Sequence, residues 1–273
     1  MKHFLSFLCS LLIATCSLLT VSCSLHAQAS EVNANNSVNF ATSMGIGWNL
    51  GNQMDAHING VAIETGWGNS PATEYTFRAL AKAGFTSVRI PVTWMGHIGA
   101  APAYTIDKAW LDRVEELVLW AKKYNLKVII NIHHDGFGAE TDAVKRSYHW
   151  LNLPAAVADE QTNTRIKQQL TMMWLQIAQR FKNEGEYLVF ETLNEIQDGK
   201  WGQGNNLHDG GAQYRVLNEW NEVCVNAIRA AGGENTHRFI GISGYVANPN
   251  LTIEHLVLPQ DDATDRLLIA VHS

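Results

Sequence analysis

Cysteine is scarce in this 273-residue chain outside its first 29 residues. Three of the four cysteines, Cys9, Cys16 and Cys23, lie in that N-terminal segment, and Cys224 alone lies beyond it. A single thiol cannot form an internal disulfide, so residues 30–273 must be stabilised by a hydrophobic core alone. That segment is long enough for one large domain.

Basic charge is also sparse and scattered. The chain has 20 Lys and Arg residues against 26 Asp and Glu residues, a formal net charge of −6 at pH 7. It has neither a basic block nor a stripe that mixes basic and aromatic residues, which argues against nucleic acid or an anionic membrane surface as a partner. A neutral ligand fits this charge balance better.

The N-terminus has the pattern of an export signal. Lys2 and His3 precede an apolar stretch over 4–21, and Ala27-Gln28-Ala29 follows as an A-x-A cleavage signal. We therefore expect residues 1–29 to be a secretory signal peptide, and the protein to be secreted, periplasmic or held at the cell surface.

Two alternatives apply to this leader. Its apolar stretch approaches the length of a membrane span, but Ser and Cys dilute it and a cleavage signal follows. A lipid anchor on Cys23 is the other alternative, although Thr20-Val21-Ser22 is a poor lead-in for one. After the leader, residues 30–43 are rich in Asn and are expected to form a flexible N-terminal segment.

From residue 44 onward, short apolar runs alternate with longer amphipathic stretches. The runs are rich in β-branched residues and do not alternate with polar ones, as expected of parallel strands buried on both faces. The longer stretches have apolar residues at helical spacing. The predicted strands lie at 44–50, 86–92, 127–132, 187–193, 238–243 and 267–272, and the predicted helices at about 71–83, 107–125, 160–182 and 212–231, with a shorter candidate at 252–256.

Alternating strands and helices specify a parallel sheet wrapped in helices, either a closed (β/α)8 barrel or an open doubly wound sheet. No glycine-rich phosphate fingerprint opens a helix after the first run. Polar residues fall at or near the carboxyl ends of five runs, which converge on one site in a barrel but spread apart in an open sheet. These residues are Asn49, Arg89, His133, Asn194-Glu195 and His272.

We therefore predict an α/β fold of the (β/α)8 type, a TIM barrel. The run that ends at His272 is only the sixth strand, so the barrel is expected to be incomplete, with two βα units of roughly 60 residues or more missing. Residues 44–273 are predicted to form this partial catalytic domain.

Glu195 is the first candidate for a catalytic group because it closes an apolar strand, YLVFETLNE over 187–195. Apolar and aromatic neighbours favour the neutral carboxyl, which suits a general acid; a helix-capping or lysine-paired glutamate is the alternative. Glu191 on the same strand lies roughly 13 Å away, whereas a retaining pair of carboxylates needs about 5–5.5 Å and an inverting pair about 6.5–9.5 Å. No later acidic residue sits at a strand tip, so the second carboxylate is expected beyond residue 273.

Two other strand-end residues each have two interpretations. Arg89 can hold a carboxylate in bidentate fashion and keep it ionised, and its partner is either the missing nucleophile or Glu191. His272 either hydrogen-bonds within the site or is a satisfied core histidine.

His133-His134-Asp135 raises the question of a metal site. Successive strand residues point to opposite faces, so two adjacent histidines seldom chelate one ion. No HExxH or HxH arrangement is present. We therefore expect no metal and no cofactor, and expect a histidine here to hydrogen-bond a substrate or orient a neighbour.

Five of the nine tryptophans come at strand ends or in the loops that follow, on the face where the site is expected. Flat rings there make platforms for the C–H faces of sugars. Ordinary loop packing is the alternative for any one of them. The five are Trp48, Trp67, Trp94, Trp150 and Trp201.

Several segments resemble glycoside hydrolase family 5, the large family of retaining (β/α)8 barrels that contains cellulases and endoglucanases. The likeness runs in family order from about Met44 to the last residue, and it is greatest to the endo-β-1,4-glucanase branch. The matching segments are GWNLGNQMDA (47–56), ETGWGN (64–69), SVRIPVTW (87–94), YTIDKAWLDRVEELV (104–118), VIINIHHDG (128–136), FETLNE (190–195) and AVHS (270–273).

The resemblance implies roles for the strand-end residues. It implies that Glu195 is the general acid/base and that Asn194 contacts the sugar 2-hydroxyl. It further implies supporting active-site residues at Arg89, His133 and His272, and substrate contacts at Asn49, Trp67 and His134, beside the predicted platforms Trp94, Trp150 and Trp201.

The resemblance also implies a retaining endo-β-1,4-glucanase that cleaves internal bonds of β-glucan polysaccharides through a glycosyl-enzyme intermediate. We expect the protein to be a monomer. The family's tyrosine after the sixth strand would fall one residue beyond Ser273, and its nucleophilic Glu and a sugar-stacking Trp are absent. We therefore interpret the chain as a C-terminally truncated copy that is itself inactive. The alternatives are a carbohydrate-binding pseudoenzyme, which would expose two strand edges, and a β-mannanase or xyloglucanase of the same fold.

Overall fold

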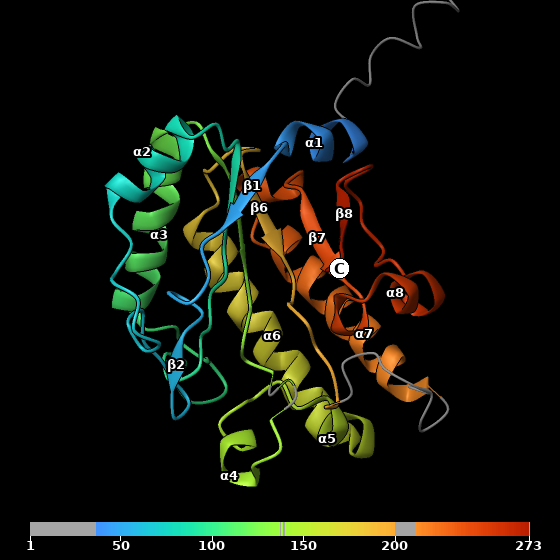
Figure 1. Ribbon diagram of the computed structural model, residues 1–273. Helices are drawn as coiled ribbons and strands as arrows, with labels where there is room; N and C mark the ends of the chain where they lie inside the picture. Colours follow the sequence, from blue (N-terminus) through green and yellow to red (C-terminus); the bar gives the residue numbers. More distant parts are fainter. Residues whose placement is uncertain (1–36, 137, 139, 200–210, 273) are drawn as a thin grey trace, which may run out of the picture.

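The computed structural model describes residues 37–136, 138, 140–199 and 211–272. Its main feature is a six-stranded parallel sheet in the order β1-β4-β5-β6-β7-β8 (Figure 1). Each of the six runs predicted to be a strand contributes one. The strands are β1 (Gly47–Asn49), β4 (Ser87–Ile90), β5 (Lys127–Asn131), β6 (Leu188–Glu191), β7 (Ile240–Ser243) and β8 (Leu267–Ala270).

The strand order decides between the two predicted architectures. Every strand pairs in parallel with the strand that precedes it in the sheet and in the chain, and the order never reverses. A doubly wound sheet has a point at which the strand order reverses, whereas a barrel does not. The prediction of the barrel type is therefore confirmed, and the described residues supply six strands of it.

Helices follow the strands and cover one face of the sheet (Figure 1). Side chains from the strands, such as Val88, Val128 and Leu188, are fully buried in one core cluster with side chains from these helices. The long helices begin within a few residues of the predicted positions, at N-cap residues such as Asp107 and Asp159 whose carboxylates accept backbone N–H bonds. These helices are α2 (Glu74–Lys82), α3 (Lys108–Lys123), α6 (Glu160–Arg180) and α7 (Ala212–Ala230), with α8 (Pro249–His255) at the short candidate.

The opposite face of the sheet changes character along the strands. Near the amino ends it carries Ile129, Val189 and Leu268, which pack in a small apolar cluster with Phe40 and Phe239. Two residues further along on this face, Asn131 of β5 lies in register with Glu191 of β6, and both are buried. Because side chains alternate between faces, the interior is apolar at one end of the strands and polar at the other.

The predicted flexible segment over 30–43 is wrong for its last residues. Residues 37–44 form helix α1 (Ser37–Met44), and the Phe40 ring stacks on Phe239 with centroids 3.8 Å apart. The helix lies across the amino ends of the strands (Figure 1). The burial of Phe40 offsets the poor helix propensity of the polar residues around it.

Sequence reasoning also missed three small elements at the carboxyl end of the sheet. A hairpin joins β2 (His57–Ile58) to β3 (Val61–Ala62), and helices α4 (Ala143–Arg146) and α5 (Leu153–Ala158) follow β5. Asn59-Gly60 makes the hairpin turn, and both residues have positive φ. An Asn-Gly pair between two short apolar segments is a strong hairpin signal, so this element could have been predicted.

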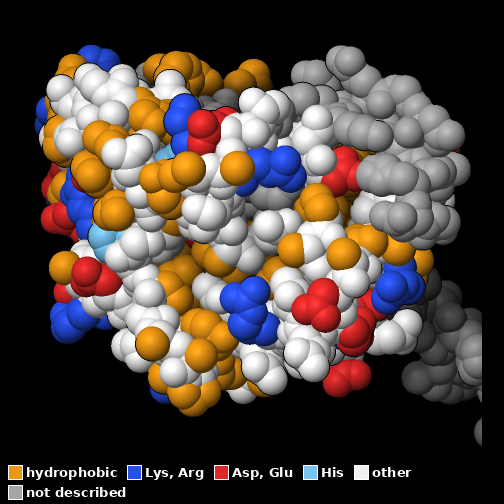
Figure 2. Space-filling view, turned by 90° about the horizontal axis from the view of Figure 1, so that it is seen from below, with side chains coloured by type: hydrophobic (Ala, Val, Ile, Leu, Met, Phe, Trp, Pro, Cys, Tyr) orange, Lys and Arg blue, Asp and Glu red, His pale blue; other side chains and the backbone are white. Residues whose placement is uncertain are grey.

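Figure 2 shows the molecule from below, the end that carries the hairpin, α4 and α5 in Figure 1. Acidic, basic and apolar side chains are interspersed over the described part of this surface. Among the described residues, no helix combines the length and the apolar character needed to cross a membrane. The predicted signal peptide, Cys23 included, lies outside the described residues.

Candidate active site

An arginine and a glutamate form the base of the polar interior. Arg89 of β4 donates from Nε to Glu191 Oε2 at 2.7 Å and from Nη2 to Glu191 Oε1 at 3.1 Å. The same guanidinium donates to Asn194 Oδ1 at 2.8 Å and to Asn49 Oδ1 at 3.1 Å. Of the two interpretations of Arg89, the structure therefore shows the pairing with Glu191, and it adds that Arg89 orients two predicted site residues.

Glu195 lies above this layer and is partly exposed, with 28% of its side chain accessible. His272, which follows β8, donates from Nδ1 to Glu195 Oε1 at 2.5 Å. This hydrogen bond, ahead of burial, sets the direction in which the pKa of Glu195 moves, which is downward. The expectation that apolar surroundings favour the neutral carboxyl is therefore wrong for the described residues, because a directed donor stabilises the charged form.

His133 and His134 lie side by side, with ring centroids 4.3 Å apart. The prediction that they point to opposite faces is wrong because β5 ends at Asn131, and strand alternation does not extend past that residue. Burial lowers the pKa of His133 well below its usual value, and burial lowers the pKa of His134 to about 4. Both rings are therefore neutral at neutral pH.

One group of three side chains within the described ranges has the spacing of a cation site. Ligand atoms of Asp55, His133 and His134 all lie within 4.8 Å of one another. Neutral imidazoles and a carboxylate are suitable ligand types for a transition metal. Whether His133 offers a lone pair to such an ion depends on which of its two ring nitrogens carries the hydrogen.

The tryptophans predicted as platforms lie in different environments. Trp67 is 44% exposed, donates from Nε1 to the His57 carbonyl at 3.0 Å, and lies 5.4 Å from the His134 ring. Trp150 is half-buried and donates to Asp135 Oδ1 at 2.7 Å. Trp67 therefore offers a free ring face beside the site, while the indole N–H of Trp150 is used internally.

Two of the tryptophan predictions are wrong, and one cannot be assessed. Trp94 is fully buried, with its indole N–H donating to the Asn131 carbonyl, so it is a core residue. Trp48 is in register with Val88, whose side chain faces the helices, and it contacts Phe85, so it does not lie on the rim. Both errors arise because position along a strand does not by itself give the direction of the side chain. Trp201 lies outside the described residues.

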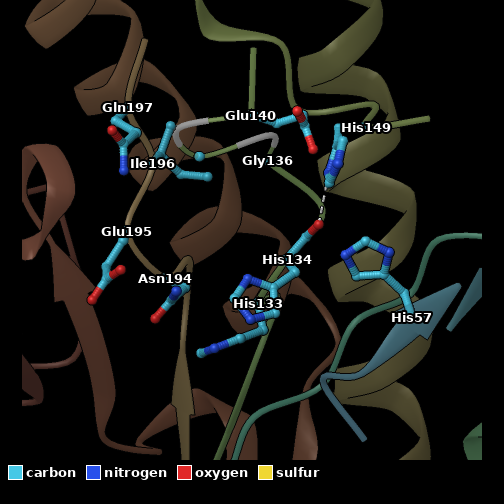
Figure 3. A pocket seen from close by; sticks show the side chains of 11 residues that line it. His57, His133, His134, Gly136, Glu140, His149, Asn194, Glu195, Ile196 and Gln197 are labelled. Atoms are coloured by element: carbon cyan, nitrogen blue, oxygen red, sulfur yellow. Dashed lines mark hydrogen bonds between the residues drawn. The ribbon is translucent and has the colours of Figure 1, made fainter. Parts of the chain in front are cut away.

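A pocket of about 270 Å³ brings these groups together (Figure 3). Asn194 and Glu195 line one side of it, and His57 and His149 line the other, with the paired histidines between them. The lining residues from the described part of the chain are His57, His133, His134, Gly136, Gly138, Glu140, His149, Asn194, Glu195, Ile196 and Gln197.

Sequence reasoning did not find His57, Glu140 or His149. The Asn-Gly turn points to the hairpin that carries His57, but no local pattern indicates that loops after β5 bring Glu140 and His149 to the same pocket. Glu140 Oε1 accepts the backbone N–H of Asp142 at 2.8 Å. These residues meet only through the tertiary arrangement of separate loops.

Gly60 at the tip of the hairpin touches the loop that precedes His149. A Cβ atom on Gly60 would lie 2.6 Å from Cβ of Tyr148, and Gly60 has φ +81°. Glycine is therefore required here on two grounds, backbone conformation and close approach. The contact ties the hairpin with His57 to the loop with His149 on one side of the pocket.

These observations define a class of protein. A carboxylate held by a histidine, beside an arginine-bound asparagine, lies at the carboxyl ends of parallel strands in sequential order, which is where (β/α)-barrel enzymes carry their sites. Comparison with known families agrees: residues 51–273 match the family described as Cellulase (glycosyl hydrolase family 5). The chain belongs to this family.

Solved structures and characterised relatives are similar over most of the chain. A Bacteroidetes-affiliated GH5 cellulase linked with a polysaccharide utilization locus is 69% identical, with a TM-score of 0.85, covering 88% of this chain and 61% of that one. A GH5-4 broad specificity endoglucanase from Bacteroides salanitronis is 55% identical, with a TM-score of 0.83, covering 89% and 62%.

Endoglucanase B of Clostridium cellulovorans is 38% identical over 231 residues, covering 84% of this chain and 47% of that protein. The chain thus spans between 47% and 62% of the length of these three relatives.

Proposed function

We propose that the protein is a retaining endo-β-1,4-glucanase in which Glu195 is the general acid/base. The observation that carries the proposal is the hydrogen bond between Glu195 and His272 at the edge of a pocket lined by Asn194 and paired neutral histidines. Family membership and relatives that are named as endoglucanases support it.

In the proposed reaction, Glu195 first donates a proton to the oxygen of the leaving sugar and later accepts one from water. A second carboxylate attacks the anomeric carbon and forms a covalent glycosyl-enzyme intermediate, which water then hydrolyses. Arg89 holds Asn194 in place, and Asn194 is the residue proposed to contact a sugar hydroxyl.

The proposal requires that nucleophile at about 5–5.5 Å from Glu195. Glu140 is the other carboxylate among the described residues that line the pocket, and it bonds within its own loop. We therefore assign the nucleophile to a part of the protein C-terminal to Ser273, in keeping with the share of its relatives that the chain spans. A carboxylate at that distance would raise the pKa of Glu195, which lies below its usual value without it, and would keep Glu195 protonated for the first step.

The proposed substrate is a β-glucan chain. The exposed face of Trp67 beside His134 is suited to stack on a sugar ring. Asn49 lies beside the site because its Oδ1 accepts a hydrogen bond from Arg89. A relative named as a broad specificity endoglucanase supports testing several glucans. We also propose export through the signal-like residues 1–29, which places the protein where polysaccharide is found.

Replacement of Glu195 in the full-length protein tests this function. Glu195→Gln is expected to lower the rate of hydrolysis by about 10²- to 10⁴-fold, because general acid–base catalysis contributes that much. Release of reducing ends from carboxymethylcellulose, xyloglucan and mannan measures it. Glu254→Gln on α8, a glutamate with 64% of its side chain accessible, is the matched control and is expected to remain active.

Three results would contradict parts of the proposal. Undiminished hydrolysis by Glu195→Gln would remove Glu195 from its role. Release of the α-anomer as the first product, seen by proton NMR, would exclude a retaining mechanism on a β-linked substrate. Glucan binding by the full-length protein without any hydrolysis would favour the pseudoenzyme.

A further inference from the structure

Asn131, the last residue of β5, is fully buried beneath the pocket and bonds to three different groups. Its Oδ1 accepts the backbone N–H of Val92 at 3.1 Å. Its Nδ2 donates to Glu191 Oε2 at 3.2 Å and lies 3.0 Å from Nδ1 of His133. A single amide therefore joins the Arg89–Glu191 pair to the histidine that lines the pocket.

The orientation of this amide is fixed from two sides. A backbone N–H can only donate, so the atom that faces Val92 must be the oxygen of Asn131. Both oxygens of Glu191 accept hydrogen bonds from the Arg89 guanidinium, so the Asn131 atom that faces this acceptor must be the nitrogen. The flipped amide would place two donors together on one side and two acceptors on the other.

The orientation of Asn131 determines the state of His133. Because Nδ2 of Asn131 is a donor, Nδ1 of His133 must accept, and a neutral imidazole then carries its hydrogen on Nε2. We propose that Asn131 is a positioning residue that holds His133 as the Nε2–H tautomer, so that His133 presents a hydrogen-bond donor to the pocket. Its effect on catalysis rests on the proposed function, whereas the tautomer itself does not.

The consequence for ligands is specific. A donor on His133 can bind a hydroxyl or ring oxygen of a sugar in the pocket that it shares with Asn194 and Glu195 (Figure 3). The same tautomer leaves no lone pair on Nε2, and the lone pair on Nδ1 already accepts from Asn131. The group formed by Asp55, His133 and His134 is therefore one ligand short of its apparent number.

The energetic setting supports a fixed tautomer. His133 is half-buried, and burial is the first cause of its lowered pKa, followed by the nearby His134, Arg89 and His272. Protonation of Nδ1 would in addition place a proton against the amide donor of Asn131. The ring thus stays neutral, and one tautomer is preferred over the other.

The tautomer can be measured directly. In the full-length protein labelled with ¹⁵N-histidine, long-range proton–nitrogen spectra at pH 7 distinguish the protonated ring nitrogen from the bare one, and the His133→Gln variant assigns the signals. We expect Nε2 of His133 to be protonated and Nδ1 to be bare. The opposite pattern, or a mixture of the two, would overturn the proposal whatever the variants show.

Asn131→Asp is the variant that reverses the contact, because a carboxylate oxygen accepts where the amide nitrogen donated. We expect the His133 proton to move to Nδ1 and kcat to fall about 10- to 100-fold, a typical cost of losing a residue that orients a site histidine, with a smaller change in KM. Asn163→Asp is the matched control: Asn163 is buried, donates to Glu219 Oε2 at 2.9 Å and accepts from Trp220 Nε1 at 2.8 Å, far from the pocket in the helix layer.

The two proposals fail in different ways. An Asn131→Asp protein in which His133 keeps its Nε2–H tautomer would overturn the positioning role. A full-length protein that shows the expected tautomer but hydrolyses no glucan would overturn the proposed function and leave the tautomer assignment intact. If Asn131→Asp does not fold, the wild-type spectrum alone decides.

Discussion

Two arginines at opposite ends of the strands, the half-buried Arg89 and the fully buried Arg238, differ in what they bond. Arg89 at the carboxyl end donates to the Glu191 carboxylate and to the amide oxygens of Asn49 and Asn194. Arg238, just before β7, donates to Asn235 Oδ1 and to four backbone carbonyls between 2.6 and 3.3 Å away, those of Phe181, Glu184, Gly185 and Leu188. The acceptors of Arg89 include a charge, whereas those of Arg238 are neutral.

The difference separates a face that serves the fold from one that serves a ligand. At the amino end, Arg238 is 1% exposed and its hydrogen bonds are made within the protein. Helix α1 adds Phe40 to the apolar cluster at the same end. At the carboxyl end, the Arg89 network orients Asn194 and reaches His133 through Asn131, and both residues line the pocket. Barrels commonly divide stability and catalysis between their two ends in this way.

Arg89→Met should have the largest effect on the free energy of unfolding. It leaves Glu191 as a buried charge without its partner, and such a loss costs about 3–5 kcal/mol. Urea denaturation of the full-length protein measures it. The double variant Arg89→Met, Glu191→Leu is expected to recover much of the stability but not the activity, because Asn194 stays unanchored. Recovery of both would show that the network is only structural.

Arg238→Met should have an intermediate effect and should spare catalysis. Leaving buried carbonyl oxygens without a donor costs about 1–3 kcal/mol, while no pocket residue loses a partner. We expect a lower urea midpoint with kcat/KM per folded molecule unchanged. A loss of activity beyond the loss of folded protein would break the proposed division between the two ends.

His272→Leu should have the smallest effect on stability and a defined effect on pH dependence. The hydrogen bond from His272 is the first cause of the lowered pKa of Glu195, so its removal raises that pKa. A general acid is active while protonated, and the basic limb of the kcat/KM profile should therefore move to higher pH. His237→Leu, at an exposed histidine that pairs with Glu234, is the control. An unmoved limb would show that His272 does not tune Glu195.

The same hydrogen bond links pH to stability. A carboxyl whose pKa is lower in the folded state contributes stability above its unfolded pKa, and this contribution is lost as the pH falls through the folded pKa. His272→Leu should therefore flatten the stability profile in acid.

The sequence predicted the strands and long helices because their patterns are local. Parallel strands such as KVIIN over 127–131 are apolar on both faces, and helices such as 160–180 carry an apolar stripe between an Asp N-cap and a basic last turn. Helix α1 was missed because its stabilising partner, Phe239, is 199 positions away in the chain. No local stretch of sequence contains both residues.

The sequence predicted which residues belong to the site better than it predicted which of them contact one another. Glu195, Asn194 and His133 line one pocket as expected from their places at strand ends. The contacts between these groups were not predictable. His133 and His134 lie side by side because β5 ends at Asn131 and the residues after it no longer alternate between faces. Trp94 illustrates the opposite case, since a strand-end tryptophan turned its ring into the core and used its N–H on a backbone carbonyl.

The contact between Gly60 and Tyr148 sets how closely the hairpin approaches the loop that precedes His149. Any larger residue at position 60 would have to displace either the hairpin that carries His57 or the loop that carries His149, whereas Glu195 and His133 follow other strands of the sheet. A substitution at position 60 is therefore expected to disturb the wall of the pocket formed by His57 and His149 without touching the proposed proton donor.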